Sequence, residues 1–222
     1  MHHCSCGCIR EEDVRRLASK ELRALEPQDL SSYHGSALYT WGDPEHYKHY
    51  LPRILELHAA HRNGLPADLG EVHTKLAYAE WTGWPEEEVQ AITDFVRADW
   101  TAFVHAEGSE LTLHLLEDYR AFLDLSELIA RWDIGGSAAA LRSFVYFFYD
   151  QGNELTGAAL KGTHGHPDNS LVRLLQPHAL LPRLEAAFFR YEATDPEYAE
   201  KLSIVLQMLE QEANALRPGN AG

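Results

Sequence analysis

Apolar residues recur at helical spacing along almost the whole chain, and strand-like alternation is hard to find beyond the first eight residues. In the segment 85–106, for example, Ile92, Val96, Trp100 and Phe103 follow one another at intervals of three or four residues. This spacing places all four on one face of an α-helix, which can bury that face against a neighbouring helix. The pattern therefore predicts an all-α fold.

Glycine and proline residues divide this pattern into short helices, because proline is tolerated at the start of a helix and glycine is favoured just after its end. The predicted helices cover residues 30–41, 44–62, 68–81, 85–106, 110–124, 126–133, 137–150, 153–161, 169–191 and 195–216. Short helices joined by tight turns are typical of stacked helical hairpins, so we expect an irregular HEAT-like bundle. We expect it to form a single all-α domain over 10–216, between a Cys/His-rich segment at 1–9 and a disordered tail at 217–222.

Several polar and proline residues predict where these helices begin or break. Asp43 is placed to cap the helix that starts at Pro44, and Ser126 to cap the helix at 126–133. Breaks are expected near Pro177 and Pro182.

Pro52 leaves two alternatives open, because it has no N–H to donate to the carbonyl of Lys48. Either one helix kinks there, or a short turn at 44–50 is followed by a second helix from Leu51.

The chain is acidic, with 19 basic residues against 34 acidic ones and a formal net charge of −15 at pH 7. Binding to a phosphate backbone draws on clustered Lys and Arg, and here the basic residues are spread out, which argues against nucleic acid as a partner. An acidic surface could instead attract a basic protein. No apolar run approaches the roughly 18 residues of a membrane span, and the start lacks a secretory signal pattern, so we expect a soluble, cytoplasmic protein without a membrane partner.

The first eight residues, MHHCSCGC, contain all three cysteines and two of the 13 histidines. In an extended segment alternate side chains point the same way, and zinc prefers Cys and His ligands in a tetrahedron. The candidate metal ligands are therefore His2, His3, Cys4, Cys6 and Cys8. Zinc is the candidate cofactor, and a distant histidine or carboxylate would complete the site. Two alternatives stay open, namely a mobile tail with adventitious metal affinity and a thiol-redox element.

Two further histidine pairs, His46/His49 and His58/His61, have a spacing that places each pair on one helix face. Each pair could share a metal ion, but neither carries the embedded glutamate of the HExxH motif. Histidines at the edge of the core or on the surface are the interpretation that we favour.

The segment GTHGHPDN at 162–169 places His164, His166 and Asp168 on one connection between helices, where such side chains can form a site. The structural alternative, which we favour, is a turn in which Asp168 caps the following helix.

Aromatic residues are concentrated in the run FVYFFYD at 144–150, which is apolar most of the way round and is expected to be a buried helix rather than a ligand platform. The tryptophans are expected mostly in the core. No dinucleotide-binding, P-loop or nucleophile-elbow signature occurs, which weighs against the common enzyme classes.

The segment ALYTWGDPEHYKHYLPRILEL at 37–57 resembles a family of uncharacterised bacterial proteins. Its members share an AL-x-TWGD element, an H-aromatic-LPR-x-LEL helix, a Cys-containing N-terminus and a W-x-x-WP-E element. In this chain these are Ala37–Asp43, His49–Leu57, Cys4–Cys8 and Trp81–Glu86. The resemblance implies a bacterial cytosolic protein and assigns no catalytic residue.

The resemblance singles out Trp41, Asp43, His49 and Arg53 as a candidate functional surface, in addition to the loop with His164, His166 and Asp168. Arg53 could pair with Asp43 or with Glu56, and we favour a structural ion pair over a substrate clamp.

Three hypotheses for function follow. The leading one is a non-enzymatic binding or adaptor protein with an N-terminal zinc-type structural site. The second is an acidic immunity-type or inhibitor protein that masks a basic partner. The third is a metal-dependent hydrolase that uses the histidine pairs and the loop at 162–169.

Overall fold

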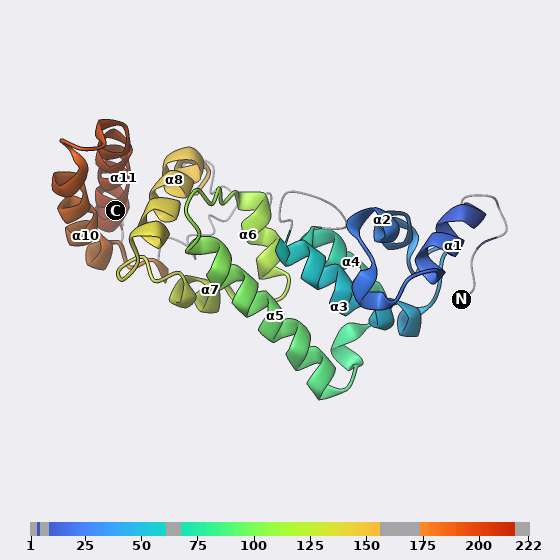
Figure 1. The fold of residues 1–222 in the computed structure, drawn as a ribbon. Coiled ribbons are helices and arrows are strands. Elements are labelled where there is room, and N and C mark those ends of the chain that lie inside the picture. The colour runs from blue at the N-terminus through green and yellow to red at the C-terminus, as the bar shows by residue number, and fades with distance from the viewer. Residues whose placement is uncertain (1–3, 5–8, 61–67, 156–173, 216–222) are drawn as a thin grey trace. The chain divides into compact units, whose positions relative to one another are not determined.

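The computed structural model describes residue 4 and residues 9–60, 68–155 and 174–215, and within these ranges it is built from helices (Figure 1). The α-helices are α1 (Glu11–Ala18), α2 (Pro27–Ser36), α3 (Pro44–Ala60), α4 (Leu69–Tyr78), α5 (Glu86–Val104), α6 (Leu113–Arg120), α7 (Leu125–Arg131), α8 (Ala138–Leu155), α10 (Pro177–Tyr191) and α11 (Pro196–Ala215). Two short 3₁₀ helices are η1 (Leu22–Ala24) and η2 (Trp81–Gly83). The described residues form no β-strand, only an isolated bridge between Ala37 and Trp41. The all-α prediction is confirmed.

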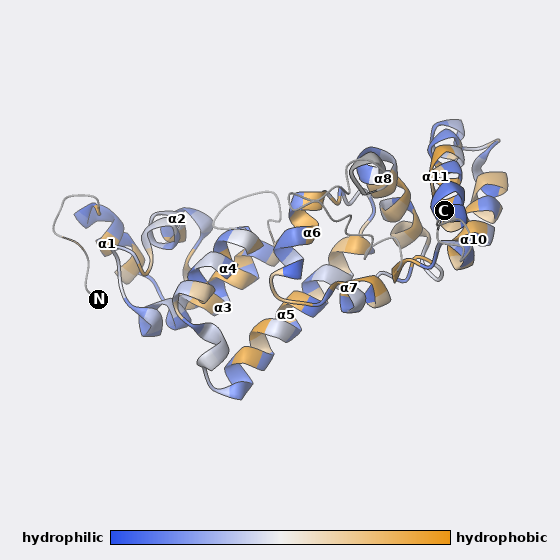
Figure 2. Cartoon of the chain, turned by 180° about the vertical axis from the view of Figure 1, so that it is seen from behind, coloured by the Kyte–Doolittle hydropathy of each residue, from blue (hydrophilic) through white to orange (hydrophobic). Residues whose placement is uncertain are grey.

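The helices carry both hydrophobic and hydrophilic residues along their length (Figure 2). In α5, the predicted stripe of Ile92, Val96, Trp100 and Phe103 is buried throughout. The spacing of apolar residues thus identified the buried face of this helix correctly. None of the helices within the described ranges combines the length and the apolar character that crossing a membrane requires.

The chain divides into two compact units, unit 1 at residues 1–99 and unit 2 at residues 100–222. In unit 1, α2 packs against α1 and α3, η1 against α3, and α4 against η2. In unit 2, α6 packs against α7, and α11 packs against both α8 and α10 (Figure 1). Helices that follow one another are mostly neighbours within each unit, as in helical hairpins. The single domain expected over 10–216 stays a prediction.

The core of unit 2 is an aromatic cluster. The indole of Trp100 is fully buried, and its ring centroid lies 4.9 Å from that of Tyr119 and 5.6 Å from that of Trp132. Its Nε1 donates to the carbonyl of Leu128 at 2.8 Å, which joins α5 to α7. Phe144 of α8 meets Trp132 with ring centroids 5.7 Å apart. This cluster connects α5, α6, α7 and α8. The prediction that the run 144–150 is buried is confirmed for Phe144, Val145, Phe147 and Phe148, whereas Tyr149 is 37% exposed.

The helix predicted for 30–41 is wrong at its C-terminal end, because α2 stops at Ser36. Leu38 has a left-handed backbone conformation with φ of 69°, which a continuous α-helix does not allow. The carbonyl of Ser36 then accepts hydrogen bonds from the N–H groups of Thr40 at 3.0 Å and Trp41 at 3.2 Å. Ala37, Leu38 and Trp41 are buried in this turn rather than in another helical turn.

A buried lysine from another helix stabilises this helix end. Lys75 of α4 is only 2% exposed, and its Nζ donates to the carbonyls of Gly35 at 3.0 Å and Ala37 at 3.1 Å. The ammonium also lies 3.7 Å from the ring centroid of Tyr39. Cations are favourable at the C-terminal end of a helix, and here the cation comes from a residue distant in the sequence.

Other boundary predictions also fail. The helix predicted to end at residue 150 continues without a break, because α8 runs to Leu155. The N-cap position of α7 is occupied by Asp124 rather than by Ser126. The break predicted at Pro182 is absent, because α10 runs through this residue just as α3 runs through Pro52. Packing of α10 on α11 supports the helix despite the hydrogen bond that a proline removes. The break predicted near Pro177 is confirmed, since α10 begins there after Gln176 with φ of 48°.

Asp43 caps α3 as predicted, since its Oδ1 accepts from the backbone N–H of His46 at 3.0 Å and lies 2.6 Å from the His46 Nδ1. These hydrogen bonds lower the pKa of Asp43. We expect Asp43→Ala to reduce the free energy of unfolding by about 1 kcal/mol in urea titrations. Asp124→Ala is the matched control, because Asp124 is an N-cap residue whose side chain makes no capping hydrogen bond. Equal losses in the two variants would contradict this role of Asp43.

Candidate functional site

Of the five N-terminal metal-ligand candidates, the structure describes Cys4. The other four, His2, His3, Cys6 and Cys8, lie outside the described residues. The backbone N–H of Cys4 donates to the carbonyl of Thr40 at 2.8 Å, and the residue is half-buried. This hydrogen bond attaches Cys4 to the turn between α2 and α3. The zinc assignment stays a prediction.

Trp41 and Arg53 have structural partners. Trp41 is buried, and its ring meets that of Tyr33 edge-on with centroids 5.4 Å apart. Arg53 pairs through Nη1 with Oε2 of Glu56 at 3.0 Å, and its Nε donates to the carbonyl of Leu25 at 2.8 Å. Of the two partners proposed for Arg53, the structure therefore shows Glu56.

The candidate histidines are dispersed where the structure describes them. His49 is exposed and contacts the ring of Tyr50, with centroids 4.8 Å apart, whereas the ring of His46 bonds to Asp43. His58 is buried, and its Nε2 lies 3.5 Å from Oδ2 of Asp99. Outside the described residues lie His61, His164, His166 and Asp168. In the part of the chain that is described, no three His, Cys, Asp or Glu side chains are grouped so that they could hold a metal ion.

The W-x-x-WP-E element borders an apolar groove of about 450 Å³ between α3 and α5. Trp84 is fixed at its edge, because its Nε1 donates to the carbonyl of Ala79 at 3.0 Å. The ammonium of Lys48 lies 4.3 Å from the Trp84 ring centroid and 2.9 Å from Oε2 of Glu88. The polar groups at this end of the groove are therefore paired with one another.

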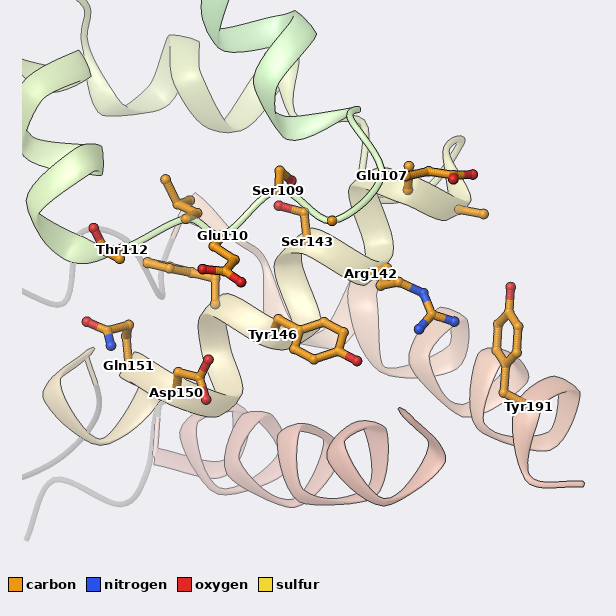
Figure 3. Close-up of a pocket in the computed structure, with 15 residues that line it drawn as sticks. Glu107, Ser109, Glu110, Thr112, Arg142, Ser143, Tyr146, Asp150, Gln151 and Tyr191 are labelled. Atoms are coloured by element: carbon orange, nitrogen blue, oxygen red, sulfur yellow. The ribbon is translucent and has the colours of Figure 1, made fainter. Parts of the chain in front are cut away.

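A larger cleft of about 770 Å³ lies within unit 2 (Figure 3). It is lined by residues 107–112 of the loop after α5, by one face of α8, and by Tyr191 at the end of α10. The loop turns at Gly108, whose φ of 72° is a left-handed conformation that glycine adopts without strain. Leu111 is buried and anchors the loop to the unit.

The face that α8 presents to the cleft follows from helical spacing. Arg142, Tyr146 and Asp150 are four residues apart, and Ser143 and Phe147 lie beside them with the same spacing. Residues four apart lie on one side of a helix. In Figure 3 the carboxylates of Glu110 and Asp150 lie to one side of the Tyr146 ring, and Arg142 lies to the other.

Arg142 is held in place by partners outside the cleft. Its Nη2 donates to Oδ2 of Asp195 at 2.9 Å, and its guanidinium lies 3.9 Å from the ring centroid of Tyr198. Burial opposes its charge, but the hydrogen bond and the charge of Asp195, together with smaller contributions from Tyr198 and Tyr146, outweigh burial and raise the pKa of Arg142. The same hydrogen bond lowers the pKa of Asp195. The positive charge of Arg142 is thus matched by a carboxylate that does not line the cleft.

Three carboxylates in the cleft lack such partners. Glu107, Glu110 and Asp150 are exposed, and none of them has an ion-pair or hydrogen-bond partner among the described residues. With Arg142 neutralised by Asp195, the lining carries an excess of negative charge. A concave site with charge of one sign concentrates ions of the opposite sign.

The cleft offers several groups that can bind a cation. No described residue of its lining is a histidine or cysteine. It offers instead carboxylates for a cation, the ring of Tyr146 for contact with that cation, and hydroxyl groups as hydrogen-bond acceptors.

The cleft is not predicted by the sequence. The prediction of a buried helix at 144–150 is correct for the four apolar residues Phe144, Val145, Phe147 and Phe148. The polar residues Arg142, Tyr146 and Asp150 repeat every four residues along the same helix. This polar stripe is the signal in the sequence from which one side of the cleft could be predicted. Residue spacing does not show that the loop at 107–112 lies opposite it.

No protein-family model, curated protein or solved structure matches this chain.

Proposed function

We propose that this protein is a non-enzymatic binding protein whose cleft in unit 2 accepts a cationic group of a basic partner protein. The observation that carries the proposal is the charge of the cleft, in which three carboxylates have no ion-pair partner among the described residues while Arg142 is bound to Asp195. A cation entering the cleft would gain electrostatic attraction without displacing an ion-pair partner from the described part of the chain.

The charge of the whole chain supports the same kind of partner. At −15, the chain attracts a basic protein from a distance and repels acidic ones. This property corresponds to the hypothesis of an immunity-type or inhibitor protein that masks a basic partner. The cleft adds a defined place at which such a partner could be held.

The N-terminal zinc-type site remains part of the proposal as a structural element. It would fix the first residues near the turn at Thr40, to which the backbone of Cys4 is already hydrogen-bonded. The metal-dependent hydrolase has less support, because the described histidines do not converge on one site.

Binding to poly-L-lysine, measured by calorimetry on the full chain at low and high salt, tests the proposal. We expect salt-sensitive binding that weakens about tenfold in the variant Glu107→Gln/Glu110→Gln/Asp150→Asn, because the cleft then loses its charge.

The matched control is Glu185→Gln/Glu192→Gln/Glu210→Gln, which removes three exposed carboxylates of unit 2 that do not line the cleft. It changes the net charge by the same amount, so it should keep wild-type affinity to within about twofold. Equal weakening in both variants would show that the charge of the chain acts without the cleft, and the proposal would fail.

A further inference from the structure

Two serine hydroxyls in the cleft lack hydrogen-bond partners among the described residues. Ser143 of α8 is 4% exposed, and the Oγ atoms of Ser143 and Ser109 are both buried. Buried hydroxyl groups in folded proteins nearly always have a partner. Both residues line the cleft, so a ligand group that enters it could supply the missing hydrogen bonds.

Glu110 adds a carboxylate to the same cleft. Glu110 follows Ser109 in the loop, and Figure 3 shows its side chain directed toward the space between this loop and α8. The loop and α8 therefore contribute two hydroxyl oxygens and one carboxylate to the same cleft. All three groups accept hydrogen bonds, and one of them is charged.

We infer that the cleft binds a primary alkylammonium group, as carried by a lysine side chain; this inference rests on the proposed function. A primary ammonium has three N–H donors on one small nitrogen, which matches three acceptors of which one is negative. A guanidinium spreads five donors over a larger plane, and a trimethylated ammonium has none. Of these three cations, the primary ammonium is thus the one whose donors best match both serine hydroxyls and the carboxylate.

The depth of the site favours a thin ligand. The two Oγ atoms are buried, so the serines must change rotamer before an ammonium can contact them. The short side chain of serine permits this change. The methylene stem of a lysine can lie along the apolar side chains of Leu111 and Phe147, with only its head group near the polar atoms. Arg142 does not oppose its entry strongly, since its charge is paired with Asp195.

The test uses NMR titrations of the full chain with blocked peptides Gly-Gly-X-Gly-Gly, in which X is lysine, arginine or trimethyl-lysine. We expect the lysine peptide to bind about tenfold more tightly than the trimethyl-lysine peptide. Ser143→Ala should remove about this tenfold difference by weakening only the lysine peptide, and Ser109→Ala should act in the same direction. Ser203→Ala, on α11 and outside the cleft, should change nothing.

The possible outcomes separate this inference from the proposed function. Equal binding of the three peptides, or unchanged affinities in Ser143→Ala, would overturn the preference for a primary ammonium while leaving a cation-binding cleft intact. Absence of binding to all three peptides, in a protein that binds poly-L-lysine through the cleft carboxylates, would also overturn it. A last titration uses cadaverine, a free diamine. If cadaverine binds more tightly than the lysine peptide, the ligand is a small amine rather than a protein side chain.

Discussion

Replacing Trp100 by alanine is expected to lower the free energy of unfolding by about 4 kcal/mol, the largest stability effect that we predict. Trp100 is fully buried, its ring contacts those of Tyr119 and Trp132, and its Nε1 donates to the carbonyl of Leu128. The alanine variant therefore loses the packing of an indole ring, leaves a cavity, and leaves a buried carbonyl without its donor. Urea unfolding followed by circular dichroism measures the change.

Two further variants check the cause. Trp100→Phe retains an aromatic ring without the N–H donor and should cost less than the alanine variant. Phe189→Ala removes a ring that is 64% exposed, and it should change the unfolding free energy by no more than about 0.5 kcal/mol. If Phe189→Ala were as destabilising as Trp100→Ala, the aromatic cluster would not be the core of unit 2.

The second large effect is expected from pH, through His34. This residue is fully buried in unit 1, and burial together with the charge of Lys75 lowers its pKa from 6.5 to about 4. Its Nδ1 lies 3.5 Å from the hydroxyl of Tyr47, and its Nε2 lies 3.7 Å from Oε2 of Glu71. At neutral pH the imidazole is uncharged, so its contact with Glu71 is not an ion pair.

The sign of the effect follows from proton binding. Between pH 6.5 and about 4, the unfolded chain binds a proton at His34 that the folded chain does not bind. The stability present above pH 6.5 is therefore lost as the pH falls through this window. The total loss is about 3 kcal/mol, which corresponds to the difference between the two pKa values.

Urea unfolding across this pH window, compared between wild type and His34→Gln, measures the contribution of His34. The variant cannot titrate at this position, so its stability should fall by about 3 kcal/mol less than that of wild type, while the loss from the carboxylates is common to both. His114→Gln is the control, since the His114 side chain is 86% exposed and the substitution should leave the wild-type pH profile in place. Parallel profiles for wild type and His34→Gln would contradict the assignment.

The fold class and most helices could be predicted because they depend on local properties. The spacing of Ile92, Val96 and Trp100 determines which face of α5 can be buried. The side chain of Asp43 and the ring of Pro44 favour a helix start through groups only a few residues apart. The error at Ser36 occurred where a distant residue contributes, since a lysine from α4 stabilises the end of α2.

The candidate site was harder to predict for the same reason. Arg142, Tyr146 and Asp150 form a visible stripe in the sequence, but nothing in their spacing shows that Asp195 neutralises Arg142. Ser109 and Ser143 are ordinary residues in the sequence, and only burial without a partner distinguishes them. Conversely, Trp41 and Arg53 were predicted to belong to a functional surface. In the structure, Trp41 packs against Tyr33 and Arg53 pairs with Glu56, both within unit 1.

By itself, the sequence determined that this protein is helical, where most of its helices begin, and that its formal net charge is −15. These properties depend on spacing, capping and composition, which are local or summed over the chain. The tertiary structure decided which charges are paired and which hydroxyls lack partners among the described residues, because these depend on residues brought together from different helices. The cleft between residues 107–112 and α8 belongs to this second class, and it is where the proposed function can be tested.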